Sequence, residues 1–257
     1  MKTVASKDGT KIAYDKQGNG PVLILILGAL NKRGSGKKLT KLLSEQFTVV
    51  SYDRRGRGDS TDTQPYEVEK EIDDIDALID ALGGSSSLYG HSSGGVLALL
   101  AAEKLEEKVQ GVALYEIPYD DDPEAQKAAK EYRRQLTQFL TEDERGDAVA
   151  LFVSSVGVTD KQIAAMQHLP LWKSLTAMAP TLAYDTVEIM KRYPNIDAQS
   201  IGNSALVMYG GASPDFMAKT ARKLAQIMPN AKLQSLEDQT HDVKPDVMAR
   251  TLMQFLG

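Results

Sequence analysis

The stretch Ser87–Leu100 constrains the fold more than any other part of the chain. A short apolar run ends in Gly90-His91-Ser92-Ser93-Gly94, and an Ala/Leu-rich segment of helical character follows. This order predicts that Ser92 lies on a sharp strand-to-helix turn with its hydroxyl clear of the backbone. Gly90 and Gly94 suit the turn because a side chain at either position would crowd it. A helix that begins at Ser93 would add free N–H groups that favour negative charge beside Ser92.

This Gly-x-Ser-x-Gly turn, with a strand before it and a helix after it, resembles the nucleophile turn of the α/β-hydrolase fold superfamily. The similarity extends over nearly the whole chain. It implies an α/β fold with a mostly parallel sheet of the eight-stranded type, helices on both faces, and an inserted helical cap.

Composition narrows the class of protein further. A chain of 257 residues is long enough for one domain that contains an inserted segment. The absence of cysteine excludes disulfides and thiol catalysis and fits a reducing compartment, so we expect a cytoplasmic protein. We expect no signal peptide and no membrane span. A net charge of -5 with both signs interspersed gives no reason to expect a nucleic acid partner.

Hydrophobic patterns predict the order of the elements. Residues 3–15 alternate around an Asp-Gly turn and predict an antiparallel hairpin at the sheet edge. An unbroken aliphatic run predicts a buried strand at 22–27, and further strands are predicted at 47–52, 109–115, 204–209 and 232–236. Helical spacing predicts helices at 66–82, 216–228 and 245–256. Residues 120–193 contain several helical patterns and no convincing strand. By resemblance, we assign 1–118 and 196–257 to the hydrolase core and 119–195 to the cap.

A serine hydroxyl needs a base to take its proton as it attacks a carbonyl. The chain has three histidines, which makes a zinc site unexpected and shortens the search for that base. His241 lies in a polar loop between the last strand and the last helix, where the superfamily places its catalytic histidine. The resemblance also implies that the backbone N–H groups of Ala29 and Ser93 form an oxyanion hole. Leu27 stands where relatives commonly carry histidine, but a backbone donor does not need that side chain.

The acid that would orient His241 has two candidates. Glu116 ends the apolar run 109–115, where an ionised carboxylate without a partner would cost several kcal/mol. Some branches of the superfamily, haloalkane dehalogenases among them, carry their acid at the end of the strand that corresponds to residues 109–115. Asp215 is the alternative. It lies two residues beyond the position at which most relatives carry the acid, and Ser213 occupies that position. Asp215 also fits an ordinary helix start with Ser213 as the N-cap. We favour Glu116.

Three arginines follow the strand predicted at 47–52, in Asp53-Arg54-Arg55-Gly56-Arg57-Gly58. We interpret this segment mainly as a structural turn in which Asp53 accepts backbone N–H bonds and pairs with an arginine. An anion subsite built from Arg54, Arg55 and Arg57 is the alternative.

The resemblance implies a serine hydrolase that acts on a small, hydrophobic carboxylic ester without metal or cofactor. The expected pocket residues are Gly28, Leu30, His91, Met166 and Trp172, although the apolar residues among 166–182 also fit a role as the core of the cap. Lactonases, carbon–carbon bond hydrolases, aminopeptidases and perhydrolases use the same machinery. Dehalogenases and epoxide hydrolases carry aspartate where Ser92 stands. A ligand-binding protein without activity is the alternative from a different class.

Overall fold

One eight-stranded sheet organises the computed structural model, which describes all residues from 1 to 257. Its strands follow the order β1-β2-β4-β3-β5-β6-β7-β8. They are β1 (Lys2–Ala5), β2 (Lys11–Gln17), β3 (Val22–Ile26), β4 (Thr48–Tyr52), β5 (Ser86–His91), β6 (Val109–Tyr115), β7 (Ser204–Gly210) and β8 (Ala231–Leu236). β2 is antiparallel to both its neighbours, and every other pair is parallel. The predicted edge hairpin and parallel sheet are therefore confirmed.

The central strands are continuous apolar runs because both of their faces are covered. In β3, Ile24 and Ile26 belong to one hydrophobic cluster, whereas Leu23 and Leu25 belong to another on the opposite face. Successive side chains of a strand point to opposite faces, so a single run of aliphatic residues supplies both layers of the core.

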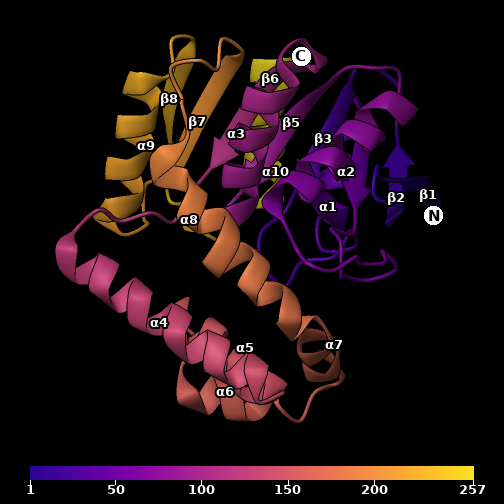
Figure 1. The fold of residues 1–257 in the computed structure, drawn as a ribbon. Helices are drawn as coiled ribbons and strands as arrows, with labels where there is room; N and C mark the ends of the chain where they lie inside the picture. Colours follow the sequence, from indigo (N-terminus) through magenta and orange to yellow (C-terminus); the bar gives the residue numbers. More distant parts are fainter.

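Helices cover the two faces of the sheet (Figure 1). The helices α2 (Val68–Ala81), α3 (Ser93–Leu105) and α9 (Asp215–Ile227) pack on the face that holds Ile24. The helices α1 (Lys37–Leu43) and α10 (Pro245–Leu256) pack together on the other face. A short 3₁₀ turn, Glu106–Lys108, joins α3 to β6. The fold class predicted from the sequence is confirmed.

A helical insertion separates β6 from β7. It contains α4 (Pro123–Thr141), α5 (Arg145–Ser155), α6 (Asp160–Met166), α7 (Pro170–Met178), the 3₁₀ turn Ala179–Thr181, the π-helix Tyr184–Ile189, α8 (Met190–Arg192) and the 3₁₀ turn Tyr193–Asn195. Figure 1 shows α4 to α7 standing clear of one edge of the sheet, with α8 leading back to it. The insertion has its own hydrophobic cluster, in which Leu136, Val149 and Leu182 are buried.

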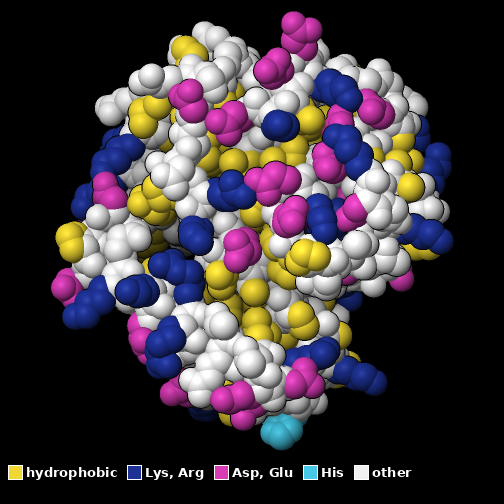
Figure 2. Space-filling view, viewed as in Figure 1, with side chains coloured by type: hydrophobic (Ala, Val, Ile, Leu, Met, Phe, Trp, Pro, Cys, Tyr) yellow, Lys and Arg dark blue, Asp and Glu magenta, His cyan; other side chains and the backbone are white.

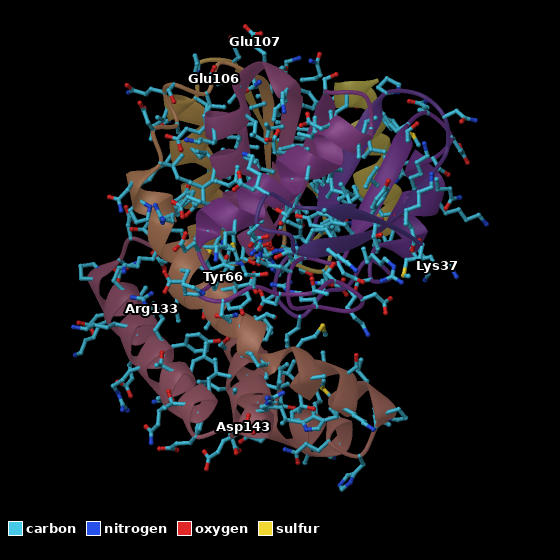
Figure 3. The ribbon with its side chains drawn as sticks, turned by 45° about the vertical axis from the view of Figure 1, so that its right-hand side comes forward. Lys37, Tyr66, Glu106, Glu107, Arg133 and Asp143 are labelled. Atoms are coloured by element: carbon cyan, nitrogen blue, oxygen red, sulfur yellow. The ribbon has the colours of Figure 1, made fainter.

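The junction between the sheet and the helical insertion is packed tightly. The ring of Tyr66 stacks on Tyr184 of the π-helix with ring centroids 3.8 Å apart. Figure 3 labels Tyr66 at this junction, whereas Asp143 lies at the far end of the insertion and Glu106 and Glu107 lie at the opposite end of the molecule. The π-helix thus attaches the insertion to the helical layer formed by α2 and α3.

Two local details differ from the sequence expectations. Helix α9 begins at Asp215 with Pro214 as its N-cap residue, and Ser213 makes no side-chain capping bond. The sequence patterns did not indicate a π-helix at Tyr184–Ile189. The boundaries of core and cap at residues 118/119 and 195/196 stay predictions. No helix of the chain is both long enough and apolar enough to cross a membrane.

Candidate active site

The strand order changes direction between β3 and β5. After β3 the chain adds β4 on one side, and β5 then pairs with the other side of β3. Loops that leave such neighbouring strands diverge and leave room for a ligand. The register pairs Ile26 with Gly90 and His91 with Tyr115, so the segments after β3, β5 and β6 begin side by side.

Ser92 occupies the sharp turn that the sequence predicts. Its backbone has φ 59° and ψ −130°, and the helix α3 starts at the next residue. A positive φ is costly for a residue with a side chain and is retained where the surroundings dictate it. A Cβ on Gly90 would lie 2.6 Å from the Gly94 oxygen, and one on Gly94 would lie 2.1 Å from the Ile26 oxygen. Both glycines are therefore required by the close packing of the turn.

The loop after β3 passes directly against Ser92. A Cβ added to Gly28 would lie 2.9 Å from Ser92 Cβ and 3.3 Å from Ser92 Oγ. The next residue, Ala29, donates its N–H to no protein acceptor. Ser93 is the first residue of α3, so its N–H has no acceptor within the helix. Two backbone donors without a protein acceptor thus belong to the segments that meet at Ser92.

Glu116 and His241 form a hydrogen-bonded pair. His241 Nδ1 lies 2.9 Å from Glu116 Oε2, and the N–H of Gly210 donates to Glu116 Oε1 at 2.8 Å. The Glu116 side chain is fully buried, whereas 37% of the His241 side chain is exposed. Burial by itself raises the pKa of Glu116, but the hydrogen bonds from His241 and Gly210 outweigh it and hold that pKa below its usual value. An ionised carboxylate can only accept a hydrogen bond, so Nδ1 of His241 is the donor in this pair.

Two side chains hold the loop that carries His241. The Tyr115 hydroxyl donates to the Thr240 carbonyl at 2.5 Å, and His91 Nε2 donates to the His241 carbonyl at 3.1 Å. The rings of His91 and His241 lie 4.7 Å apart. Burial and the nearby His241 lower the pKa of His91 to about 3, so His91 remains neutral. The last loop is thereby fixed next to the residue that precedes Ser92.

The reactive atoms themselves are unpaired. Neither Ser92 Oγ nor His241 Nε2 makes a hydrogen bond within the protein, and they are not bonded to each other. Such a contact commonly forms only when substrate is bound. The His241 ring therefore has no protein partner at Nε2, and its side chain is partly exposed.

Asp215, the alternative acid, lies apart from this arrangement. It is an exposed residue at the start of α9 and makes no side-chain hydrogen bond or ion pair. The structure brings Glu116 to His241 and gives Asp215 the environment of an ordinary helix start. The roles assigned to Ser92, His241 and Glu116 in catalysis stay predictions.

The arginine turn is a structural element. Asp53 accepts the N–H groups of Arg33 and Asp59 and pairs with the Arg33 guanidinium, as predicted. Arg54 pairs with Glu71 and Asp185, and Arg55 pairs with Asp74 and Asp8. Arg57 pairs with Asp185 and donates to the Gly28 carbonyl. Since all three buried arginines are held by carboxylates or carbonyls of the chain, the alternative of an anion subsite here is wrong.

Sequence reasoning missed Asp185 and Tyr115. Asp185 is buried and accepts hydrogen bonds from Arg54, Arg57 and Ser93. No local signal marked Asp185, because the helical stretch 182–189 contains a second carboxylate, Glu188, and nothing in the sequence shows which of the two is buried. Tyr115 gave no signal either, because a tyrosine at the end of an apolar strand is ordinary core.

The residues predicted to line a pocket fall into two groups. Leu30 and Ala29 pack against the hydrophobic cluster of the helical insertion, as do Met166 and Trp172. Leu30 also has a positive φ of 55°, which places another strained residue in the loop beside Ser92. His91 uses its ring to hold the His241 carbonyl, and Gly28 is buried against Ser92. Their role in binding a substrate stays a prediction.

Comparison with known proteins identifies the family of the chain. The profile of the alpha/beta hydrolase family matches residues 32–251. The chain belongs to the alpha/beta hydrolase family. A crystal structure of an alpha/beta hydrolase from Sphaerobacter thermophilus DSM 20745 is similar over 100% of both chains, with 44% identity and a TM-score of 0.87.

Two relatives of this alpha/beta hydrolase carry functional names. A putative esterase/lipase of Haemophilus influenzae is 24% identical over 93% of this chain and 84% of its own length. A 2-(acetamidomethylene)succinate hydrolase of Mesorhizobium japonicum is 33% identical over 40% of this chain and 38% of its own length. The match to the second protein thus spans well under half its length.

Proposed function

We propose that this alpha/beta hydrolase is a serine hydrolase that cleaves a small, hydrophobic carboxylic ester through an acyl-enzyme on Ser92. The observation that carries the proposal is the Glu116–His241 pair, whose loop is fixed beside the strained turn of Ser92. A buried carboxylate that orients a partly exposed imidazole is the arrangement a serine needs to become a nucleophile.

In the first half of the reaction, Ser92 Oγ attacks the carbonyl carbon while its proton passes to His241 Nε2. The carbonyl oxygen becomes an oxyanion that accepts the N–H groups of Ala29 and Ser93. The bond from carbon to the alcohol oxygen then breaks, and the alcohol takes the proton from Nε2. Glu116 stabilises the charged imidazolium throughout this step.

In the second half, water attacks the acyl carbon and gives a proton to His241 Nε2. The bond between Ser92 Oγ and the acyl carbon breaks, and Oγ regains the proton. The products are the carboxylic acid and the alcohol, and the enzyme returns to its starting state. The apolar residues between the loop 28–30 and the helical insertion support a preference for a hydrophobic acyl or alkyl group.

The test combines turnover with covalent labelling. The protein and its Ser92→Ala variant are incubated with a short-chain aryl ester and, separately, with a serine-directed aryl phosphonate. We expect turnover of the ester, and a mass adduct on Ser92 that the variant lacks. A protein that shows neither turnover nor an adduct is a binding protein, and the proposal is then wrong.

A further inference from the structure

The buried carboxylate of Asp185 connects the helical insertion to the turn that carries Ser92. Asp185 belongs to the π-helix Tyr184–Ile189, and its side chain is 1% exposed. Oδ1 accepts from Arg54 at 2.6 Å and from the Ser93 hydroxyl at 2.7 Å, and Oδ2 accepts from Arg57 at 2.5 Å. Its partners lie in two segments that precede it by about ninety residues or more in sequence.

The first connection leads to the peptide group between Gly28 and Ala29. Arg57 Nη1 donates to the Gly28 carbonyl at 2.8 Å while Nη2 of the same guanidinium is held by Asp185. The Gly28 carbonyl and the Ala29 N–H belong to one planar peptide unit, so fixing the oxygen also fixes the direction of the N–H. A cation bonded to the carbonyl also polarises the unit and strengthens the N–H as a donor.

The second connection leads to Ser93. The bond from its hydroxyl to Asp185 anchors the side chain of the residue that begins α3. The N–H of Ser93 is the other free donor beside Ser92. One carboxylate thus contacts Ser93 directly, and the Gly28–Ala29 peptide through a single arginine.

The surrounding charges show why Arg57 depends on Asp185. Arg54 has a second carboxylate partner, because Glu71 accepts from its Nε and Nη2 at 2.7 and 2.6 Å. Arg57 has Asp185 as its one carboxylate partner, and its Nε has no acceptor. Without Asp185, this buried guanidinium would retain only the Gly28 carbonyl and would be free to reorient away from it.

We propose that Asp185 is a positioning residue that orients the two backbone donors, Ala29 N–H and Ser93 N–H, toward the oxyanion of the reaction. This inference rests on the proposed function of Ser92. The helical insertion thereby contributes to the oxyanion hole, because it supplies the carboxylate that positions the two backbone donors.

The principal experiment compares Asp185→Asn with Asp74→Asn. Asp74 is a matched control because it is also 1% exposed and pairs with a buried arginine, Arg55, but it contacts neither the loop 28–30 nor Ser93. On a short-chain aryl ester, we expect Asp185→Asn to lower kcat by about 10- to 100-fold, somewhat less than removal of a whole oxyanion donor costs. KM should change by less than about twofold, because the interaction strengthens in the transition state. Asp74→Asn should keep the kcat of the wild type per folded molecule.

A second readout separates positioning from general loss of structure. The same kinetics are measured on the thionoester, in which sulfur replaces the carbonyl oxygen and accepts backbone hydrogen bonds more weakly. In the wild type, the ratio of kcat for ester to kcat for thionoester reports how much the donors contribute. We expect this ratio to fall in Asp185→Asn and to stay at the wild-type value in Asp74→Asn.

Ser93→Ala provides an independent variant with little risk to folding. It removes the hydroxyl that binds Asp185 but keeps the Ser93 N–H and every arginine pair, and it should lower both kcat and the ester-to-thionoester ratio severalfold.

The inference is overturned if the wild type hydrolyses the ester while Asp185→Asn behaves like Asp74→Asn. If Asp185→Asn does not fold, the inference is overturned by a Ser93→Ala variant in which kcat and the ester-to-thionoester ratio are unchanged. A wild type without turnover or phosphonate adduct would instead reject the proposed function itself.

Discussion

At the scale of single residues, the site depends on backbone conformations that side chains ordinarily avoid. Leu30, Ser92 and Glu116 all have positive φ values, of 55°, 59° and 49°. They lie in the segments that follow three neighbouring strands, β3, β5 and β6. Such strained conformations persist where the surrounding packing requires them. Here they occur directly after three strands that are neighbours in the sheet.

The first prediction concerns the acid. Glu116→Gln keeps the size of the side chain but removes the charge that holds the imidazole tautomer and stabilises its protonated form. We expect kcat on an aryl ester to fall by about a thousandfold or more, as for loss of the acid in other triads. Asp215→Asn should leave kcat within about twofold, because this exposed side chain makes no contact with His241. The opposite pattern would assign the acid to Asp215.

The second prediction concerns the approach of the loop 28–30 to the nucleophile. In Gly28→Ala the new methyl would lie 2.9 Å from Ser92 Cβ, so one of the two segments must move. We expect kcat to fall by about 10- to 100-fold, since displacements of this order in a reacting geometry have such effects. Gly202→Ala is the matched control, because a Cβ there meets no atom within 4 Å and its φ is not positive. Equal kcat values for the two variants would contradict the described geometry.

At the scale of elements, the helical insertion is stabilised by its own caps as well as by its apolar cluster. Thr159 and Gln162 form a reciprocal capping box at the start of α6, whose Ile163 is buried in that cluster. Thr159→Ala removes the side-chain cap and should lower the free energy of unfolding by about 1 kcal/mol.

This third prediction is measured by thermal unfolding. A loss of that size corresponds to a decrease in Tm of about 2 to 4 °C for a chain of this length. Thr137→Ala serves as the control, because its exposed hydroxyl donates to a carbonyl within α4 and caps no helix end. A Tm decrease that is no larger in Thr159→Ala than in Thr137→Ala would show that the capping box contributes nothing measurable.

Elements differ in how far their sequence predicts them. The strands and the helices α2, α9 and α10 carry a period of 2 or 3.6, or a continuous apolar run, and were predicted to within about two residues. Glu116 was identified because an ionisable group at the end of a buried strand requires a partner. Asp185 was not identified, because its role depends on a hydrogen bond with Arg54, which lies 131 residues away in the sequence. Contacts between segments so distant in sequence leave no local pattern.

At the scale of the whole molecule, the candidate site is assembled from five segments that lie far apart in the sequence. The loop after β3, the turn after β5, the end of β6, the loop after β8 and the π-helix of the insertion all contribute. Charged side chains of both signs are interspersed over the face shown in Figure 2. The concentrated charges lie inside instead, where Arg54 and Arg57 meet Glu71 and Asp185.

Buried carboxylates of this kind make stability depend on pH. The pKa of Glu116 is lower in the folded protein than its ordinary value of 4.5. Between the two pKa values the unfolded chain binds more protons than the folded one, so the free energy of unfolding rises with pH in that window. The contribution of Glu116 is therefore complete above about pH 5 and is lost as pH falls below 4.5, by at most about 1.4 kcal/mol per pH unit.

The fourth prediction follows from that sign. Urea unfolding at pH 7, 5, 4 and 3 should show that Glu116→Gln loses less free energy of unfolding between pH 5 and pH 3 than the wild type does, even if it is less stable at pH 7. Asp215→Asn should retain the wild-type dependence, because its carboxylate is exposed and forms no ion pair. Parallel curves for Glu116→Gln and the wild type would mean that Glu116 gains no stabilisation from ionising in the folded state, and its bond to His241 could not then be the charge-assisted contact on which the proposed catalysis depends.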